Sequence, residues 1–467
     1  MNKITRSNQI LAEQLIDSIM KDYDAAGLAA CIIDSTGYTQ YEIFKGYSDI
    51  ETKKPVNEDT IFGLASVTKS FTAMAIMQLA EEGKISLTDP VSKYIPEFTN
   101  KNTKPITIQH LLSHAGGFFP THRTTMREVI EKYNLKISGD PAYNVELAEK
   151  GCEAVCALLD EQTMEKGLHG LPGERMSYCN DGFGLLSEIV RRCSEYDSYA
   201  EYLHEKILVP ANMTRSFCDF IKPTIDENAS ILYQKKDGKL TGHRDYTDNA
   251  FVLNGGGAMK STLHDLKEYL YIYLNEGKTM DGERIIKDVS IREMCKPRQP
   301  HSRYGYYGYG LYTDIIGGLN VIEHGGSLPG VSSNIAFSYD NECAVIVLCN
   351  TSDVPVSVIS NALMKMYAGY CPLPERNYRE YKWKKETILN ALGTYNSSED
   401  SSFEIIQNED GTLSIKDENG TRDIITTGPE NALIINKYSD TFLKLIETEE
   451  RGIFAIQYGS RVIPKVQ

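Results

Sequence analysis

The chain has 467 residues, of which 41% are hydrophobic, with a mean hydropathy of -0.34 and a formal net charge of -15. A globular chain of this length predicts two domains, because a single hydrophobic core rarely grows beyond about 250–300 residues. The acidic balance and the lack of a basic cluster argue against nucleic acid and membrane surfaces as partners, since binding to phosphate groups depends on Lys and Arg.

The N-terminus and the cysteines indicate the compartment. Residues 1–10 lead into an amphipathic pattern rather than an apolar signal core, and no run of about 18 apolar residues follows anywhere. The ten cysteines contain no Cys-x-x-Cys pair. We therefore expect a cytoplasmic protein with reduced cysteines. The sequence has no His-Glu-x-x-His motif or Cys/His cluster, so neither a metal nor another cofactor is predicted.

The first predicted elements are a helix and a hairpin. Residues 10–23 have the apolar spacing of an amphipathic helix. Residues 27–34 and 38–44 read as two strands joined by Ser35-Thr-Gly37, which is typical of an antiparallel hairpin. The tetrad Ser18-Ile-Met-Lys21 lies on the polar face of the helix, and we interpret it as solvent-exposed surface.

Residues 61–79 carry the pattern around which the rest of the chain is interpreted. Ser66 and Lys69 stand three positions apart at the head of an apolar, Ala- and Met-rich run that indicates a buried helix. Residues i and i+3 are neighbours on a helix, so the amine can take the proton of the hydroxyl. A lysine with the ordinary pKa of about 10.4 stays protonated at neutral pH, so burial must lower this pKa. The pattern predicts a serine nucleophile with a lysine base.

The middle and later segments define the predicted fold. Residues 119–173 are mostly polar, with a helical pattern over 145–159, and we interpret them as a lid or side wall of the site. From Gly305 the apolar period changes toward two, which predicts strands at 309–313, 320–323, 333–338 and 344–350, followed by a closing helix over 355–370. Strands near both ends with helices between them predict an α+β domain, an antiparallel sheet flanked by helices.

The last segment predicts a second domain. Short strand-like pieces at 403–406, 413–416, 432–436, 442–447 and 453–462 alternate with turn signals, which indicates a small antiparallel β-barrel. We place the domains at residues 1–375 and 376–467. Because every predicted site residue lies before Gly330, we expect the barrel to affect substrate access or assembly rather than the chemistry.

Three short patterns occur in chain order, Ser66-x-x-Lys69, Tyr178-x-Asn180 and His324-Gly-Gly326. With flanks such as Phe-Gly-Leu-Ala-Ser-Val-Thr-Lys and Glu-His-Gly-Gly-Ser-Leu-Pro-Gly, they resemble the serine β-lactamase-related family over about residues 10–370. That family comprises penicillin-binding proteins, class C β-lactamases, and related esterases and D-aminopeptidases. The resemblance implies their transpeptidase-like fold with a helical subdomain. The segment around Leu392-Gly-Thr-Tyr395 resembles the lipocalin-like barrels appended to some members.

The resemblance also assigns roles to particular residues. Ser66 would be the nucleophile, Lys69 its proton acceptor and Tyr178 the partner acid or base. The predicted substrate-binding residues are Asn180, His324, Gly326 and Ser327. The backbone amides of Ser327 and Ser66 would form the oxyanion hole. Where many members have Lys-Thr-Gly this chain has His-Gly-Gly, as in the esterase and D-aminopeptidase members.

These assignments predict a cofactor-free serine hydrolase, an esterase or a peptidase or amidase, that acts on a small molecule or peptide and could be specific for D-amino acids. One alternative is an acyltransferase or peptide cyclase, in which an amine resolves the same acyl-enzyme. Another is a ligand sensor that has kept the fold without catalysis. The sequence leaves the choice of substrate and the oligomeric state open.

Overall fold

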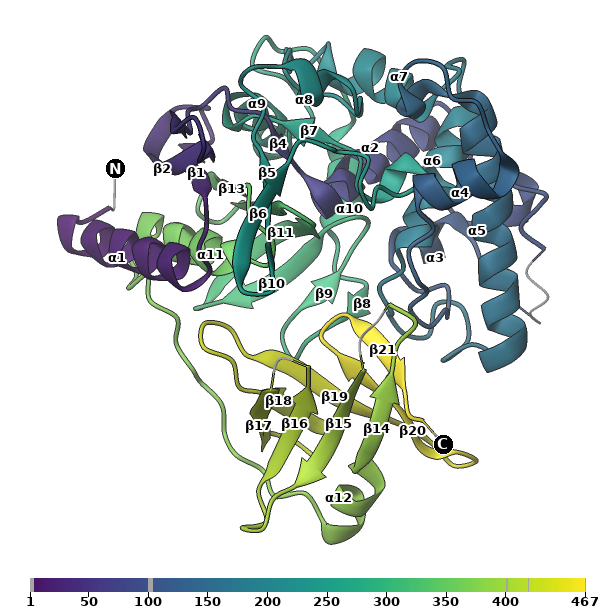
Figure 1. Ribbon diagram of the computed structural model, residues 1–467, viewed down its shortest axis with the longest axis vertical. Helices are drawn as coiled ribbons and strands as arrows, with labels where there is room; N and C mark the ends of the chain where they lie inside the picture. The colour runs from purple at the N-terminus through teal and green to yellow at the C-terminus, as the bar shows by residue number, and fades with distance from the viewer. Residues whose placement is uncertain (1–3, 100–103, 400–401, 419, 467) are drawn as a thin grey trace.

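The computed structural model describes residues 4–99, 104–399, 402–418 and 420–466. The chain forms two bodies: helices surround a large sheet in the upper one, and strands of the C-terminal part build the lower one (Figure 1). The upper body is an α+β domain and the lower one an antiparallel barrel, so the predicted fold class is confirmed.

A nine-stranded antiparallel sheet is the frame of the upper body. Its strand order is β3-β2-β1-β13-β12-β11-β10-β9-β8, so strands from both ends of the domain meet at its centre. In β1 and β13, Cys31 lies opposite Ile346. Both strands are apolar along their length because both faces of the sheet are covered. The strands are β1 (Gly27–Asp34), β2 (Thr39–Asp49), β3 (Lys54–Pro55), β8 (Gln299–Pro300), β9 (Tyr306–Tyr307), β10 (Tyr312–Ile316), β11 (Leu319–Leu328), β12 (Val331–Ser338) and β13 (Cys343–Cys349).

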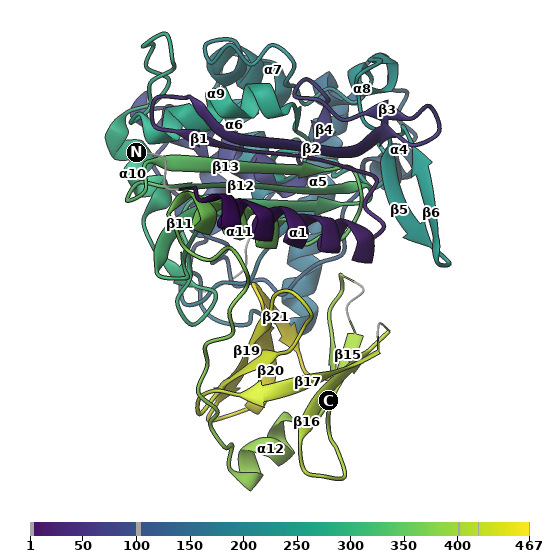
Figure 2. The same cartoon turned by 90° about the vertical axis from the view of Figure 1, so that its left-hand side faces the viewer.

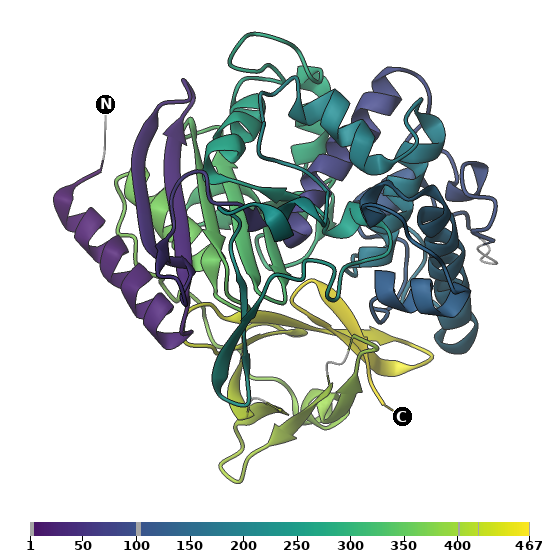
Figure 3. The same cartoon turned by 45° about the horizontal axis from the view of Figure 1, so that its top comes forward.

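Two terminal helices cover one face of this sheet. α1 (Arg6–Asp22) and α11 (Val356–Tyr367) lie side by side over the strands (Figure 2) and share one apolar core with β1 and β13. Figure 3 shows the strands of the sheet between α1 on one side and the helices around α2 on the other. The predicted hairpin of residues 27–44 and the predicted closing helix are both present.

The other face carries α2 (Thr68–Glu81) and the helices around it. Every residue of α2 from 68 to 79 is buried, as the Ala- and Met-rich run predicted. Residues 119–173, predicted as a side wall, contain two of the surrounding helices. The helices on this side are α3 (Ile108–Leu112), α4 (Met126–Tyr133), α5 (Val145–Lys166), α6 (Asn180–Cys193), α7 (Tyr199–Leu203), α8 (Lys222–Ile225), α9 (Leu263–Leu274) and α10 (Asp288–Cys295).

Two small two-stranded sheets complete the upper body. β4 (Phe62–Gly63) pairs with β7 (Lys260–Ser261), and β5 (Leu232–Lys236) pairs with β6 (Lys239–His243). The first of these sheets leads directly into the segment of Ser66. In the described residues, no helix has the length and apolarity needed to cross a membrane.

The C-terminal barrel has eight antiparallel strands paired in chain order. They are β14 (Gly393–Asn396), β15 (Ser402–Gln407), β16 (Leu413–Asp417), β17 (Gly420–Thr426), β18 (Asn431–Ile434), β19 (Thr441–Thr448), β20 (Gly452–Tyr458) and β21 (Arg461–Pro464). A bridge between Tyr395 and Lys465 joins the first strand to the end of the last, so the barrel is nearly closed. Trp383, before α12 (Lys385–Ala391), belongs to the barrel core. The boundary predicted at 375/376 falls in the segment between α11 and α12 and stays a prediction.

Two predicted strands differ from the structure. Of residues 309–313, only Tyr312 and Thr313 belong to a strand, β10. Residues 453–462 form parts of two strands, β20 and β21, because a turn at Gly459 and Ser460 interrupts them. Gly459 has a φ of 56°, a left-handed conformation that glycine adopts at low cost. This turn reaches the predicted catalytic residues.

Candidate active site

The nucleophile segment is a tight turn between β4 and α2. Ser66 lies in the short 3₁₀ helix η1 (Ala65–Val67), and the preceding Ala65 has a φ of 45°. A non-glycine residue in this left-handed region is strained, and such strain persists only where surrounding contacts hold it. The contacts come from β12, whose Ser333 hydroxyl donates to Leu64 O at 2.7 Å. The turn places Ser66 half-buried at the head of α2.

Lys69 has the geometry of a base for Ser66. Its Nζ lies 3.1 Å from Ser66 Oγ, 2.9 Å from Asn180 Oδ1 and 2.8 Å from the Gly256 carbonyl oxygen. A neutral amine has two N–H donors and one lone pair. The two donors match the Asn180 and Gly256 oxygens, which leaves the lone pair for the hydroxyl proton of Ser66.

The environment of Lys69 favours this neutral form. The side chain is fully buried, and this burial is the main cause that lowers the pKa of Lys69 well below its ordinary value. The positive charge of Arg461 lowers this pKa further, whereas the charge of Glu399 acts in the opposite direction. The condition set by the sequence, a lysine whose pKa is lowered by burial, is therefore met.

Tyr178 lies beside both residues but retains its proton. Lys69 Nζ is 4.8 Å from the centroid of its ring, and the rings of His114 and Tyr307 pack against it at 4.1 and 6.5 Å between centroids. Burial raises the pKa of Tyr178 above its usual range, and a hydrogen bond with Ser66 opposes this rise only in part. These directions favour a neutral lysine beside a protonated phenol, which suits Tyr178 to donate a proton.

His324 is placed differently from a substrate-contacting side chain. It is buried, with Nε2 3.0 Å from Tyr307 Oη and Nδ1 2.7 Å from the Gly325 carbonyl oxygen. A neutral imidazole that donates from Nδ1 and accepts at Nε2 satisfies both contacts. Burial lowers the pKa of His324 to about 3, and a lowered pKa favours this neutral form. Its role in substrate binding stays a prediction, and the geometry favours support of Tyr307 instead.

Gly326 and Ser327 lie at the end of β11 that faces the nucleophile. A Cβ atom on Gly326 would stand 2.1 Å from Leu64 O and 3.0 Å from Ser66 N. Only glycine allows this close approach of the strand to the turn. Ser327 follows as an exposed residue, so the two predicted oxyanion-hole residues, Ser66 and Ser327, border the same narrow space. Their role stays a prediction.

The structure adds two residues that the sequence reasoning missed, Glu399 and Arg461. Asn180 Nδ2 donates to Glu399 Oε1 at 3.3 Å, and Arg461 Nε donates to Glu399 Oε2. The guanidinium carbon of Arg461 lies 4.9 Å from the centroid of the Tyr178 ring. Both residues belong to the barrel, so the barrel contacts the predicted catalytic residues directly. The expectation that it affects substrate access or assembly rather than the chemistry stays a prediction. No sequence motif identifies these two residues, because they are 62 residues apart in the chain. Glu399 lies in a connection between strands and Arg461 at the start of a strand, where charged residues are common.

Backbone contacts fix the barrel against the same residues. Tyr178 N donates to Ser460 O at 2.8 Å, and Val462 N donates to Ser177 Oγ at 3.1 Å. Phe119 of the upper body packs in one apolar cluster with Val462 and two other barrel side chains. The turn after β20 is therefore part of the wall of the site.

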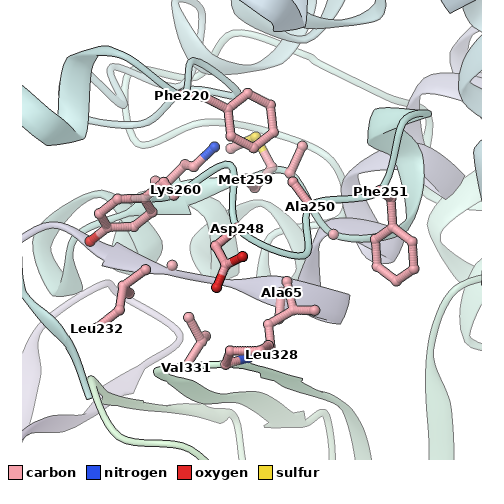
Figure 4. A pocket seen from close by; sticks show the side chains of 15 residues that line it. Ala65, Phe220, Leu232, Asp248, Ala250, Phe251, Met259, Lys260, Leu328 and Val331 are labelled. Carbon is pink, nitrogen blue, oxygen red and sulfur yellow. The ribbon is translucent and has the colours of Figure 1, made fainter. Parts of the chain in front are cut away.

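A small, mostly apolar cavity, whose lining also includes the charged residues Asp248 and Lys260, adjoins the nucleophile turn (Figure 4). It has a volume of about 30 Å³, room for about two water molecules. Figure 4 shows Ala65, Leu328 and Val331 on its border. Ala65 and Leu328 are the chain neighbours of Ser66 and Ser327, so the cavity opens beside the two predicted oxyanion-hole residues. Within the described ranges, no group of three or more His, Cys, Asp or Glu side chains could hold a metal ion.

The family of the chain follows from comparison with known proteins. Residues 12–365 match the family described as Beta-lactamase. The chain belongs to the beta-lactamase family. The resemblance inferred from the three motifs is thereby confirmed, and the matched residues contain the whole predicted site but none of the barrel.

Relatives of this beta-lactamase-family chain occur in bacteria of two genera. Protein Rv1367c of Mycobacterium tuberculosis (strain ATCC 25618 / H37Rv) is 27% identical over 300 residues, which cover 59% of this chain and 69% of that protein. Protein flp of Staphylococcus aureus (strain NCTC 8325 / PS 47) is 24% identical over 352 residues, which cover 74% of this chain and 64% of that protein. The match therefore spans less than two thirds of the length of flp.

Solved structures share the fold. The octameric penicillin-binding protein homologue from Pyrococcus abyssi aligns with a TM-score of 0.67 and 24% identity over 97% of this chain and 99% of that chain. SurE with D-Leu aligns with a TM-score of 0.67 and 16% identity over 99% and 100% of the two chains. A D-stereospecific amidohydrolase from Streptomyces sp. aligns with a TM-score of 0.58 and 21% identity over 77% and 98%.

Proposed function

We propose that the chain is a serine hydrolase that cleaves an ester or amide bond through an acyl-enzyme on Ser66. The observation that carries this proposal is the buried Lys69 amine 3.1 Å from Ser66 Oγ, with its other two contacts taken by acceptors. Membership in the beta-lactamase family supports the same chemistry.

The mechanism follows from the protonation states. Ser66 Oγ attacks the substrate carbonyl carbon while its proton moves to Lys69 Nζ. The backbone amides of Ser66 and Ser327 would stabilise the negative charge on the carbonyl oxygen. Tyr178 would donate its proton to the leaving group as the bond to the carbonyl carbon breaks, and the Lys69 ammonium would return a proton toward the phenol. Water then attacks the acyl-enzyme and releases the acid and Ser66.

The substrate we propose is a small ester or amide, including amides of D-amino acids. The cavity beside Ala65 and Leu328 has about 30 Å³ of space and a mostly apolar lining, which suits a short aliphatic side chain on the acyl group. The D-amino acid part of the proposal is supported by the description of one structural neighbour as a D-stereospecific amidohydrolase.

Labelling with a fluorophosphonate tests the proposal. We expect one adduct per full-length chain, carried by Ser66 and lost in Ser66→Ala. The matched control is Ser18→Ala, which removes the other Ser-x-x-Lys serine, an exposed residue of α1 whose hydroxyl donates to Gln14 O. An adduct that persists in Ser66→Ala, measured by intact mass and peptide mapping, would overturn the assignment.

A further inference from the structure

The catalytic side chains meet the barrel at two charged groups. Glu399 accepts a hydrogen bond from Asn180 and is ion-paired with Arg461, while the Arg461 guanidinium lies over the Tyr178 ring. Asn180 in turn accepts from Lys69. A continuous chain of contacts thus joins the two barrel residues to the base.

We propose that Glu399 and Arg461 are positioning residues of the Ser66 site, which orient Asn180 and Tyr178 and set the electrostatic field at the Lys69 amine. The inference rests on the proposed function, because it assigns these residues to the acylation step. On this inference the barrel takes part in acylation through these two residues.

The distances are short enough for such an effect. Lys69 Nζ and the Arg461 guanidinium carbon lie 4.8 and 4.9 Å from the centroid of the same Tyr178 ring, so the two groups are within about 10 Å of each other. At an effective dielectric constant of about 20, one unit charge at that distance shifts a pKa by about one unit. The side chains of Arg461 and Glu399 are 34% and 19% exposed, so solvent screens the interaction in part.

The two barrel charges act on Lys69 with opposite signs. Arg461 disfavours the ammonium form and lowers the pKa of Lys69, whereas Glu399 favours that form and raises the pKa. Six other titratable or charged groups face Lys69: Tyr178 and Cys179 just before α6, Asp181 on α6, and His114, His324 and Arg123. The test therefore compares variants in which only one barrel charge changes.

The pH profile of fluorophosphonate labelling measures the effect on the full-length chain. Acylation needs neutral Lys69, so the rate constant falls as the pH drops through the pKa of Lys69. Arg461→Met should move this acidic limb up by about one pH unit, and Glu399→Gln should move it down by about one unit. The double variant should return it close to the original position, and Arg461→Lys, which keeps the charge, should leave it in place.

A matched control lies in the same barrel. Arg422 also pairs with a carboxylate, Asp417, and Arg422→Met should leave the limb unmoved. If Arg461→Met and Glu399→Gln slow labelling equally at every pH without moving the limb, the barrel only covers the site and the inference is overturned. Thermal unfolding of each variant identifies any that fails to fold. If Arg461→Met fails to fold, the downward shift in Glu399→Gln, measured against the unshifted Arg461→Lys, still tests the inference.

A second measurement separates this inference from the proposed function. The ¹³Cε resonance of Lys69, assigned by its loss in Lys69→Met, reports the protonation of the amine without any reaction. Opposite shifts of its titration midpoint in the two single variants would support the inference even if no fluorophosphonate reacted. Unmoved midpoints would overturn it even if Ser66 were labelled.

Discussion

At the scale of single residues, a second buried lysine shows how burial of an amine lowers the free energy of unfolding. Lys260 lies on β7, beside the nucleophile segment, with Nζ 3.4 Å from the centroid of the Phe220 ring and a hydrogen bond to Cys218 O of 3.1 Å. Burial is the main cause that lowers the pKa of Lys260 to about 7. The unfolded chain, in which this pKa is about 10.4, therefore binds more protons than the folded chain between pH 7 and 10.

We predict that Lys260→Met stabilises the protein at neutral pH. Because the pKa of Lys260 is lowered on folding, its contribution to stability rises with pH across the window from about 7 to about 10 and is unfavourable at pH 7. The variant should raise the free energy of unfolding at pH 7 by roughly 2–4 kcal/mol, with the lost contacts included, and should flatten the pH dependence above pH 7. Urea unfolding at several pH values measures both effects.

The control for this prediction is Lys296→Met, which removes an exposed lysine and should change the free energy of unfolding by less than about 0.5 kcal/mol at any pH. A lower stability of Lys260→Met at pH 7 would show that the Lys260 ammonium is well solvated or well paired, and the assignment of a lowered pKa would be wrong.

At the scale of elements, the approach of β11 to the nucleophile turn determines the geometry of the site. Gly326 leaves no room for a side chain, because a Cβ there would collide with Leu64 O and crowd Ser66 N. Its neighbour Gly325 has space, since an added Cβ would meet its closest atoms at 3.7 Å. Neither residue has a positive φ, so the two positions differ in space rather than in backbone conformation.

We predict that Gly326→Ala separates β11 from the turn, while Gly325→Ala does not. Overpacking at Gly326 should lower the free energy of unfolding by about 1–3 kcal/mol. Displacement of the predicted oxyanion-hole amides of Ser66 and Ser327 should slow labelling of Ser66 by about 10–100-fold. Chemical unfolding and labelling kinetics of the two variants measure these changes. Equal behaviour of Gly326→Ala and Gly325→Ala would refute the close contact.

At the scale of the whole molecule, an apolar contact holds the barrel against the upper body beside the candidate site. Phe119 packs with Ile446, Ala455 and Val462, next to the turn that carries Ser460 and Arg461. Loss of this contact should therefore loosen the barrel and weaken the support of Tyr178.

We predict that Phe119→Asp partly undocks the barrel, because a buried unpaired carboxylate costs several kcal/mol in an apolar cluster. Small-angle scattering should show a larger radius of gyration, and labelling of Ser66 should slow at least tenfold. Ile225→Asp, at an exposed position of α8, is the control and should change neither. A Phe119→Asp chain that stays compact and reacts at the original rate would show that the docking depends on other contacts.

The sequence by itself determined the parts of this protein that rest on local patterns. The buried helix after Ser66, the i and i+3 placement of Lys69 and the strand periods that define the sheet follow from residue spacing and apolar periodicity, which act within one element. The order of the three motifs was enough to indicate the beta-lactamase family, which the match over residues 12–365 confirmed.

The tertiary structure alone decided which distant groups meet at the site. His324 turns inward to Tyr307, and the strand expected over 453–462 breaks at Gly459, so that Arg461 reaches Tyr178. Glu399 reaches Asn180 across 219 residues of chain. Such contacts depend on how the two cores pack against each other, because a side chain carries no local signal for a partner that only long-range packing brings near.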